Sequence, residues 1–432
     1  MATAAGWRPT HAHLRATFAG TVLLVAALAL GRPDLALIGT PLAVVALWAG
    51  INRPRRAPHV VGRGDRLTVQ EGEDFSWTCT VSEVDAGARV VVVHPSQRFL
   101  EVSPASGVVE LAAADSVVVG IGLRALRWGR RTLGHPALAV YDPWLAWRWG
   151  PVEVLSHALT VLPAPTAISA TAPAPHPRGL VGMERAVRAG EGGEFNKVRP
   201  FAPGDRLRRI HWAVTARTGQ LHVTATHSDE DTQVALLVDA LNDIGESTGL
   251  DGSHSSMDIT VRAVAAVAEQ FLRRGDRVGM RVFGAWSVSL LPARSGQVQL
   301  RRILDSLSLI EPGSARGAAT LTARRGLSPG TLVVMFSPLV EPSVSAQVAL
   351  LLRSGLDIVV VDTLPPAAIT SASTAPDPEA LAWRIRMLER RVELDRLASL
   401  GVPVVTWSGP HSLDLVLRDL SLRPTRPRLV VR

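Results

Sequence analysis

The sequence is poor in cysteine and in charge. Only one of its 432 residues is cysteine, which excludes an intrachain disulfide and a metal cage built from cysteines alone. That residue, Cys79, lies in the apolar run FSWTCTV, where we expect a small core residue. Charged residues make up 19% of the chain and hydrophobic residues 47%, so the chain is apolar for a soluble protein. This balance indicates that part of the chain meets lipid.

Motifs of familiar enzymes are also missing from the sequence. The stretch Gly190–Gly193 lacks the Gly-Lys-Ser/Thr ending of a P-loop and is typical of a turn. Neither a Gly-x-Ser-x-Gly elbow nor a His-Glu-x-x-His pair occurs. His211 has no evident carboxylate or nucleophile as a companion. We therefore expect no catalytic residue and no enzymatic activity, and no cofactor beyond a possible Mg²⁺.

The net charge is +8, and arginine supplies nearly all of it. A GC-rich genome and arginines that flank membrane helices are the simplest source of this excess. A nucleic-acid-binding surface would need basic residues on one face with aromatic residues between them. The arginines here are scattered along the chain, so we expect no nucleic-acid partner.

Two apolar runs, at residues 14–30 and 35–51, stand near the amino terminus. Each run is at the short end for crossing a bilayer. The first could also be a signal peptide, but no convincing small-x-small cleavage site follows, and the second run comes almost at once. We interpret residues 1–56 as a transmembrane helical hairpin, with Trp48 as an interfacial anchor and membrane lipid as a partner.

Arginines flank this hairpin on both sides, at positions 8 and 15 before it and 53, 55 and 56 after it. Positive charge favours the cytoplasmic side of a membrane, so both ends of the hairpin should lie in the cytoplasm. The near absence of cysteine agrees with a reducing compartment. The sequence thus predicts a multi-pass protein of the inner or plasma membrane, with the bulk of the chain cytoplasmic.

Residues 60–165 contain short β-branched runs separated by turn residues, a pattern that indicates an antiparallel sandwich or barrel. The predicted strands cover residues 67–70, 75–81, 88–93, 107–111, 116–123, 136–141 and 158–163. The stretch 126–150 holds four of the eleven tryptophans, which we expect to fill the core or meet the bilayer surface; a ligand-stacking platform is an alternative. Asp142 and Pro143 should form a tight turn. Residues 166–180, rich in Ala, Pro and Thr, are interpreted as a linker.

From residue 231 to 422 strand-like and helix-like runs alternate, which predicts a doubly wound parallel sheet. We expect strands at 232–239, 277–284, 287–292, 331–337, 356–363 and 402–407, and helices at 259–275, 299–310, 344–355, 378–400 and 412–420. In such sheets ligands bind outside the carboxyl ends of the strands. Asp239, Ser337 and Asp362 stand at three of these ends.

The segment 181–230 carries the most specific pattern in the chain. An arginine-led loop precedes Pro-Gly-Asp and a short helix with Arg, Trp and Ala-Arg, formed here by Arg199, Pro203, Gly204, Asp205, Arg209, Trp212, Ala216 and Arg217. With the Asp-Pro segment upstream and the strand at 275–284, it resembles the bacterial family catalogued as domain of unknown function 58. The sequence departs from the family at Pro200 and Phe201, where glutamate and tyrosine are usual.

This resemblance implies a von Willebrand factor A-like α/β domain, preceded by the hairpin and the sandwich-like domain, and partnership with a MoxR-type AAA+ ATPase. Asp205 could cap the short helix, and Trp212 could anchor that helix on the neighbouring sheet. Arg209 and Arg217 could pair with carboxylates and fix the segment to the α/β domain. Alternatively, the arginines of the segment dock an acidic partner or bind phosphate or nucleic acid.

Von Willebrand A domains often hold a divalent cation at the top of the sheet. The resemblance implies Asp239 as a ligand, but Leu241 and Asp243 replace two usual serines, and Ser337 stands where a second aspartate is usual. Thr320 could be the threonine ligand of the family. Asn242 or Asp243 could compensate for the lost oxygens, although such a set would bind Mg²⁺ weakly.

Three functions remain open from the sequence. The leading one is a membrane-anchored, non-catalytic protein-interaction or assembly factor that works with a MoxR-type AAA+ ATPase. The second is a divalent-metal-dependent enzyme or sensor that uses Asp239. The third is a nucleic-acid binder, which the scattered basic charge disfavours.

Overall fold

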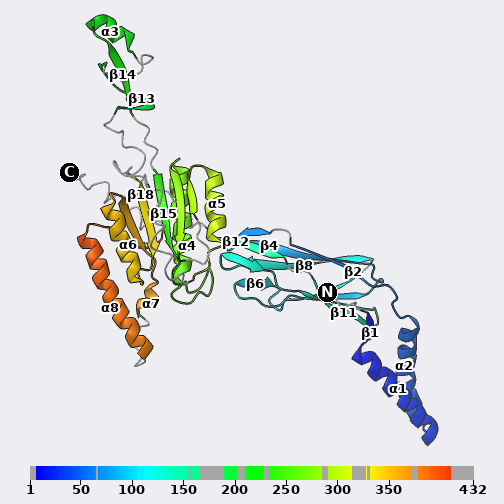
Figure 1. Cartoon of the computed structure of the whole chain (residues 1–432). Coiled ribbons are helices and arrows are strands. Elements are labelled where there is room, and N and C mark those ends of the chain that lie inside the picture. Colours follow the sequence, from blue (N-terminus) through cyan, green and yellow to red (C-terminus); the bar gives the residue numbers. More distant parts are fainter. Residues whose placement is uncertain are drawn as a thin grey trace. The chain divides into compact units, whose positions relative to one another are not determined.

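The structure is a computed structural model, and it describes residues 6–64, 67–113, 115–154, 157–164, 189–201, 210–227, 233–284, 290–313, 327, 331–370 and 378–409. The chain divides into two units (Figure 1). The first unit comprises Met1–Pro163 with Thr248–Gly252, and the second comprises Ala164–Ser247 with Ser253–Arg432. Each unit is described by itself below.

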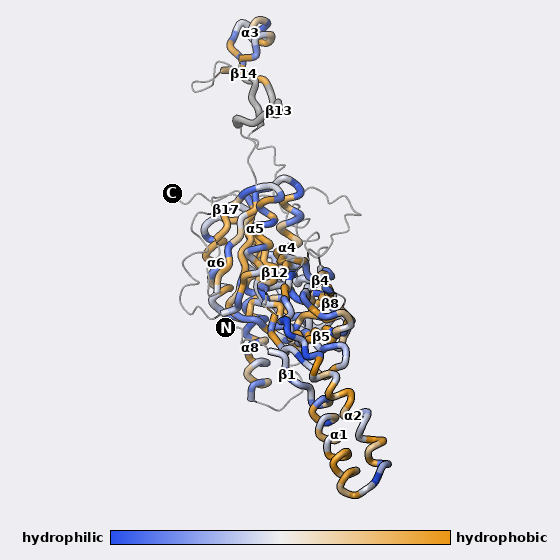
Figure 2. Tube along the Cα trace, turned by 90° about the vertical axis from the view of Figure 1, so that its right-hand side faces the viewer, coloured by the Kyte–Doolittle hydropathy of each residue, from blue (hydrophilic) through white to orange (hydrophobic). Residues whose placement is uncertain are grey.

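The first unit begins with two apolar helices, α1 (His11–Leu30) and α2 (Pro33–Ile51). Thr10 caps α1 by accepting a hydrogen bond from the backbone N–H of His13, and Gly31 ends it in the left-handed conformation. Proline at the first position of α2 suits a helix start. Both helices are long and apolar enough to cross a membrane, and Figure 2 shows hydrophobic colouring along most of their length. The predicted helices at 14–30 and 35–51 lie within these bounds.

The two helices approach each other closely through small residues. An added Cβ at Gly20 would lie 2.8 Å from the backbone nitrogen of Ala43, and one at Gly39 would lie 2.8 Å from Cβ of Leu23. Small residues permit this approach, and in lipid such packing drives helix association. Large side chains point away from the pair, and Leu28 is 86% exposed. Exposed apolar surface on this scale is typical of helices that lie in lipid.

The rest of the first unit is built from short strands, as the sequence predicts. They are β1 (Trp7–Pro9), β2 (His59–Gly64), β3 (Thr68–Gln70), β4 (Asp74–Ser82), β5 (Arg89–Val93), β6 (Leu100–Ser103), β7 (Val108–Ala112), β8 (Ser116–Ala125), β9 (Gly129–Thr132), β10 (Ala137–Tyr141), β11 (Trp147–Glu153) and β12 (Ala158–Leu162). Their orders are β1-β11-β10-β5-β7, β2-β4-β8-β6 and β3-β12-β9.

One core joins these sheets. Val90 and Val92 of β5 belong to the same buried cluster as Trp77 and Cys79 of β4, so two sheets pack face to face. The prediction that Cys79 is a small core residue is confirmed: it is fully buried, and burial raises the pKa of its thiol to about 11.

The sequence missed β1, β2, β6, β9 and β11, because each is short or interrupted by polar residues, glycine or proline. The turn predicted at Asp142 is confirmed. The Asp142 carboxylate accepts hydrogen bonds from the backbone N–H groups of Trp147 at 2.7 Å and Trp144 at 3.3 Å. The tryptophans of the region divide: Trp128 and Trp149 are buried, whereas Trp144 is 58% exposed.

The second unit contains a six-stranded sheet of order β17-β16-β15-β18-β19-β20. Its elements are β15 (Gln233–Asp239), α4 (Ser256–Arg273), β16 (Arg277–Phe283), β17 (Leu290–Arg294), α5 (Gln297–Leu307), β18 (Leu332–Ser337), α6 (Pro342–Arg353), β19 (Asp357–Asp362), α7 (Pro366–Thr370), α8 (Pro378–Ser399) and β20 (Val404–Thr406). Only β17 runs antiparallel to its neighbour among the described strands of this sheet.

The predicted doubly wound α/β sheet is therefore present. Strand β18 is buried at every position, as expected for a parallel strand covered on both faces. Helix α4 starts with a capping box, in which the Ser255 hydroxyl accepts from the backbone N–H of Asp258 and the Asp258 carboxylate accepts from that of Ser255. The helix predicted at 412–420 and the linker at 166–180 lie outside the described residues.

A separate hairpin precedes this sheet in the sequence. Strand β13 (Ala189–Pro200) pairs antiparallel with β14 (His222–His227), and the short helix α3 (Trp212–Thr218) lies between them in the chain. His211 caps α3 through its Nδ1 atom, which accepts from the backbone N–H of Val214 at 3.3 Å. Asp205, which the sequence predicts as a helix cap, lies outside the described residues.

We predict that Gly20→Ala separates α1 from α2, because its methyl group would meet the backbone of Ala43. Overpacking of this kind costs roughly 1–3 kcal/mol. Spin labels at positions 14 and 47, both exposed, report the distance between the helices by electron paramagnetic resonance in bilayers. The distance distribution should widen and shift to longer values.

Gly50→Ala is the matched control, because an added Cβ at Gly50 meets nothing within 4 Å. It makes the same change within a helix and should leave the distribution as it is. An identical distribution for Gly20→Ala would show that the helices do not pack through this contact.

Candidate functional site

The order of the parallel sheet fixes where a ligand site would lie. Strand β15 comes first in the chain; β16 is added on one side of it and β18 on the other. The side on which successive strands are added to the sheet therefore changes between β15 and β18. In doubly wound sheets the ligand crevice lies at this switch point, outside the carboxyl ends of the strands. Asp239 ends β15 and Ser337 ends β18, so these two residues mark the candidate site.

The switch point is bridged by a buried hydrogen bond. The Ser337 hydroxyl donates to Oδ2 of Asp239 at 2.6 Å, and the backbone N–H of Leu241 donates to Oδ1 at 3.0 Å. Ser337 accepts in turn from the backbone N–H of Leu339 at 2.9 Å. Burial disfavours the carboxylate and raises the pKa of Asp239 to about 6, although both hydrogen bonds act in the opposite direction.

A second polar contact closes the neighbouring strand end. The Arg390 guanidinium of α8 forms an ion pair with Asp362 at 2.5 Å, where both side chains are buried. Nε of Arg390 also donates to the backbone oxygen of Pro338 at 2.9 Å, just after β18. The backbone N–H of Leu364 donates to the other oxygen of Asp362 at 3.0 Å. One arginine thus joins α8 to the ends of β18 and β19.

The loop after β19 closes the edge from the other side. The backbone N–H of Thr363 donates to the carbonyl of Ser337 at 3.1 Å, and the Thr260 hydroxyl of α4 donates to the Thr363 hydroxyl at 2.8 Å. Both threonines are buried. Among the described residues, the strand ends at this edge are therefore linked by hydrogen bonds between the protein's own groups.

Of the residues expected to ligate a cation, the described ones do not gather into a ligand set. Both oxygens of Asp239 accept hydrogen bonds within the fold, and Oδ1 of Asp243 accepts from the backbone N–H of Met257 at 3.0 Å. Asn242 is exposed, and Thr320 lies outside the described residues. Among the described residues no three His, Cys, Asp or Glu side chains gather around one point. This arrangement fits a divalent ion poorly, because such an ion needs several oxygens that are not already committed.

The residues of the arginine segment are only partly placed. Arg199 lies in β13, opposite Val223 of β14, and Arg217 lies in the last turn of α3. Pro203, Gly204, Asp205 and Arg209 fall outside the described residues. Trp212 begins α3 and is 69% exposed, which differs from the anchoring role that the sequence suggests. The structure thus assigns neither bracing nor docking to this segment.

Sequence reasoning missed the role of Arg390 and the surface of α8. Arg390 lies in a helix rich in charge, and nothing local distinguishes it from its neighbours. The apolar surface was detectable, because Leu381, Ile385, Leu388 and Val392 follow one another at intervals of four, three and four residues. All four side chains are about half exposed or more.

These features define a class of protein: a doubly wound α/β domain whose switch point is bridged by a buried hydrogen bond, on a chain that also carries a β-rich unit and two apolar helices. Residues 197–366 match the family model described as "Protein of unknown function DUF58". The match begins in β13 and ends at the start of α7, so it includes the arginine segment and both ends of the switch point.

Curated mycobacterial proteins are similar to part of the chain. The uncharacterized proteins Rv1480 of Mycobacterium tuberculosis and Mb1516 of Mycobacterium bovis are each 30% identical over 130 residues. The match covers 30% of this chain and 40% of the length of each relative.

Solved structures resemble the chain only weakly. The cupredoxin domain of amoB from Nitrosocaldus yellowstonii has 11% identity and a TM-score of 0.17, covering 25% of this chain and 88% of its own. A non-cellulosomal cohesin from Archaeoglobus fulgidus has 14% identity and the same TM-score, covering 24% and 91%. Scores this low carry no argument.

We predict that Asp239→Asn removes a pH dependence of stability. The folded pKa of about 6 lies above the ordinary aspartate pKa of 3.8, so the folded state retains a proton that the unfolded state releases. The stabilisation is complete below the lower value and is lost as the pH rises through about 6. It amounts to about 3 kcal/mol, from 1.36 kcal/mol per pKa unit. Denaturant unfolding of the full chain in detergent, at several pH values, measures it.

The comparison is between the variant and the wild type at each pH. The variant should gain stability relative to the wild type as the pH rises from 4 to 7. A constant difference across this range would show that Asp239 does not titrate in this window.

We predict that Arg390→Met destabilises the second unit by roughly 3–5 kcal/mol, because it leaves Asp362 buried without its partner. Arg301→Met is the matched control: Arg301 and Asp305 form an exposed ion pair one turn apart on α5, and its loss should cost less than about 1 kcal/mol. The midpoint of denaturant unfolding measures both. The double variant Arg390→Met with Asp362→Asn should recover part of the stability that Arg390→Met loses. Equal losses of stability for Arg390→Met and Arg301→Met would contradict the buried pair.

Proposed function

We propose that this chain is a membrane-anchored, non-catalytic protein-interaction or assembly factor that works with a MoxR-type AAA+ ATPase. The proposal takes the α/β domain as von Willebrand A-like. The strand order, with β15 at the centre and the antiparallel β17 beyond β16, supports that comparison. The partner follows from the sequence resemblance of the arginine segment, Arg199 to Arg217.

The observation that carries the proposal is the outer face of α8. Leu381, Ile385, Leu388 and Val392 form one stripe along this helix, with exposed fractions between 49% and 68%. Side chains spaced at four, three and four residues fall on one side of a helix, as in the seam of a coiled coil. We call this stripe the α8 seam. An exposed apolar stripe of this kind is suited to pairing with another helix.

The opposite side of α8 is bound to its own domain. Leu397 is 2% exposed and Arg390 is 6% exposed. Glu393 accepts a hydrogen bond from Ser345 of α6 at 2.9 Å, and Nε1 of Trp383 donates to the carbonyl of Ala368 at 2.8 Å. These contacts hold the helix in one rotation about its axis, so the α8 seam is a fixed surface that needs no rearrangement to bind.

Charge beside the α8 seam suggests the chemistry of its partner. Three exposed arginines and two exposed carboxylates flank the seam, so basic residues are in excess there. They are Arg384, Arg391, Arg396, Glu389 and Asp395. A partner helix with an apolar stripe and acidic neighbours would match this surface. In the proposal this helix belongs to the AAA+ ATPase.

Membrane anchoring by α1 and α2 completes the proposal. Their side chains are largely exposed, with 6% of the α1 window and 17% of the α2 window buried. A core helix of a soluble protein would be mostly buried. Arginines on both flanks of the hairpin favour a cytoplasmic location for both ends and for the rest of the chain.

The test is copurification of the tagged full chain from detergent extracts of its native host, with the MoxR-type ATPase identified by mass spectrometry. We predict that Ile385→Glu with Leu388→Glu lowers recovery of the ATPase at least about tenfold. Two buried charges in an apolar interface would cost more than the roughly 1.4 kcal/mol that this factor represents.

Val298→Glu with Leu350→Glu is the matched control, because these side chains are 70% and 55% exposed on α5 and α6. It makes the same chemical change on helices of the same unit and should leave recovery unaltered. Equal recovery with the α8 variant would remove the seam from the interface. Failure of the wild type to recover any such ATPase would contradict the partnership itself.

A further inference from the structure

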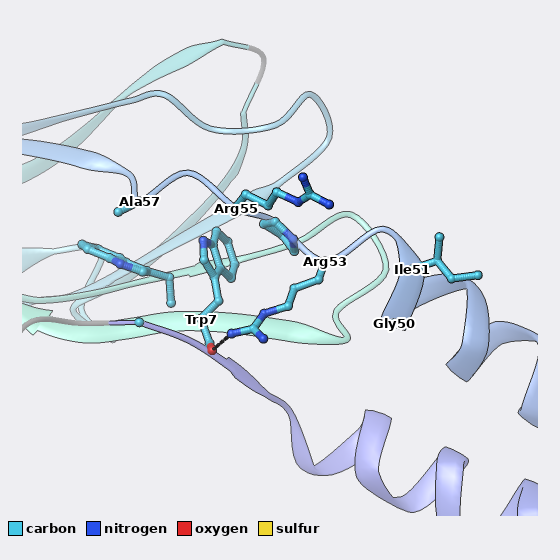
Figure 3. Close-up of a pocket in the computed structure, with 9 residues that line it drawn as sticks. Trp7, Gly50, Ile51, Arg53, Arg55 and Ala57 are labelled. Carbon is cyan, nitrogen blue, oxygen red and sulfur yellow. Dashed lines mark hydrogen bonds between the residues drawn. The ribbon is translucent and has the colours of Figure 1, made fainter.

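A cavity of about 560 Å³ lies at the base of the helical hairpin, within the first unit. Trp7 of β1 and Trp149 of β11 line it, together with Arg53 and Arg55 from the segment after α2. Figure 3 shows Trp7, Arg53 and Arg55 around this space. All of its lining residues are described, and none is acidic. Two guanidinium groups with two indole rings suit an anion that is attached to an apolar body.

The two arginines differ in how they are held. Nη2 of Arg53 donates to the backbone oxygen of Trp7 at 3.4 Å, and its guanidinium lies 4.8 Å from the ring centre of Trp147. Arg55 is exposed and makes no hydrogen bond or ion pair with any residue that the structure describes. One cation is therefore positioned in advance, while the other is available to a ligand.

The cavity adjoins the ends of both apolar helices. Ile51, the last residue of α2, lines it and is 70% exposed. Helix α1 begins two residues after β1. The turn at residues 142–147 is tied to both helices: Nε1 of Trp147 donates to the carbonyl of Ala49 at 2.8 Å, and the Thr10 hydroxyl donates to the carbonyl of Leu145 at 2.7 Å. If α1 and α2 lie in lipid, the cavity is at the level of the headgroups.

The same turn presents two apolar side chains outwards. Trp144 is 58% exposed and Leu145 is 43% exposed. The buried Asp142 carboxylate fixes the turn by accepting hydrogen bonds from the backbone N–H groups of Trp144 and Trp147. Leu145 adopts a positive φ of 56°, a conformation that non-glycine residues rarely take. Exposed tryptophan beside the start of a membrane helix is typical of an interfacial anchor. This places a lipid-contacting surface next to a cationic cavity.

We infer that the cavity binds the phosphate of an anionic phospholipid in the adjoining leaflet, with Arg53 and Arg55 as its cations and Trp144 and Leu145 inserted beside the acyl chains. A guanidinium group can donate two parallel hydrogen bonds to the oxygens of one phosphate. In this inference the indole rings of Trp7 and Trp149 pack on the apolar part of the headgroup. The inference rests on the proposed membrane anchoring and adds the class of lipid that the chain recognises.

The experiment titrates the full chain in maltoside micelles with phosphatidylglycerol or phosphatidylcholine and counts bound lipid by native mass spectrometry. The wild type should bind phosphatidylglycerol in preference. Arg53→Gln with Arg55→Gln should weaken that binding roughly 30-fold, because each arginine near a membrane surface contributes about a fivefold factor. Arg55→Gln alone should weaken it about fivefold. This single change removes no hydrogen bond or ion pair within the described structure, so it tests the site without disturbing the polar contacts of the fold.

Arg63→Gln with Arg130→Gln is the matched control, since it removes the same charge from two exposed arginines of the same unit. It should bind phosphatidylglycerol like the wild type. The inference is overturned if the control falls as far as the Arg53 and Arg55 variant, or if that variant binds normally. Displacement of the lipid by an equal concentration of inorganic phosphate would overturn it in favour of a free anion.

Flotation separates this inference from the proposed function. A chain that does not float with phosphatidylcholine vesicles contradicts the membrane anchoring as well as the lipid site. A chain that floats with them but shows no preference for phosphatidylglycerol overturns the lipid site alone.

Discussion

The buried ion pair between Arg390 and Asp362 is the contact on which the organisation of the second unit depends. It joins α8 to the end of β19, and the bond from Arg390 to the Pro338 carbonyl adds the end of β18. A charge buried at this position requires its partner, so α8 has one allowed rotation on the sheet. That rotation directs Leu397 inwards and the α8 seam outwards. The same contact links the strand ends next to the switch point between β15 and β18, where doubly wound proteins hold ligands. The orientation of the proposed docking surface and the linked ends of β18 and β19 thus depend on one contact.

A different constraint governs the first unit. Helices α1 and α2 bury little of their apolar surface, and they approach each other through Gly20 and Gly39, a contact through small residues of the kind that helices make in lipid. If the helices lie in lipid, they also fix the depth, relative to the membrane surface, of the residues that are hydrogen-bonded to their ends. Trp147 and Thr10 bond the turn at 142–147 to those ends, so the β-rich unit presents Trp144, Arg53 and Arg55 together. The proposed anchor and the proposed lipid site are consequences of one arrangement.

Much of the fold could be predicted from the sequence, and so could the strand ends of the candidate site, but the contacts that join those ends could not. Continuous apolar runs such as 232–239 identify parallel strands because burial on both faces leaves no polar position. Short strands such as β1 and β9 escaped prediction, since their pairing with distant strands, and not their own composition, makes them strands. Asp239 was identified at the end of its strand, yet its partner Ser337 is 98 residues away. An aspartate at the end of a strand is the pattern for a metal ligand and equally for a hydrogen-bond acceptor, so the sequence could not decide between these two roles for Asp239.

The sequence by itself determined the apolar hairpin, the β-rich segment, the order of strands and helices in the α/β domain, and the buried state of Cys79. These follow from periodicity and composition, which act over a few residues. Only the tertiary structure decided that Arg390 occupies the sheet edge, that α8 exposes an apolar stripe, and that Arg53 and Arg55 share a cavity with Trp149. Each of these depends on which distant groups meet, and the energy of a buried charge or an exposed apolar side chain is set by its surroundings and not by its neighbours in the chain.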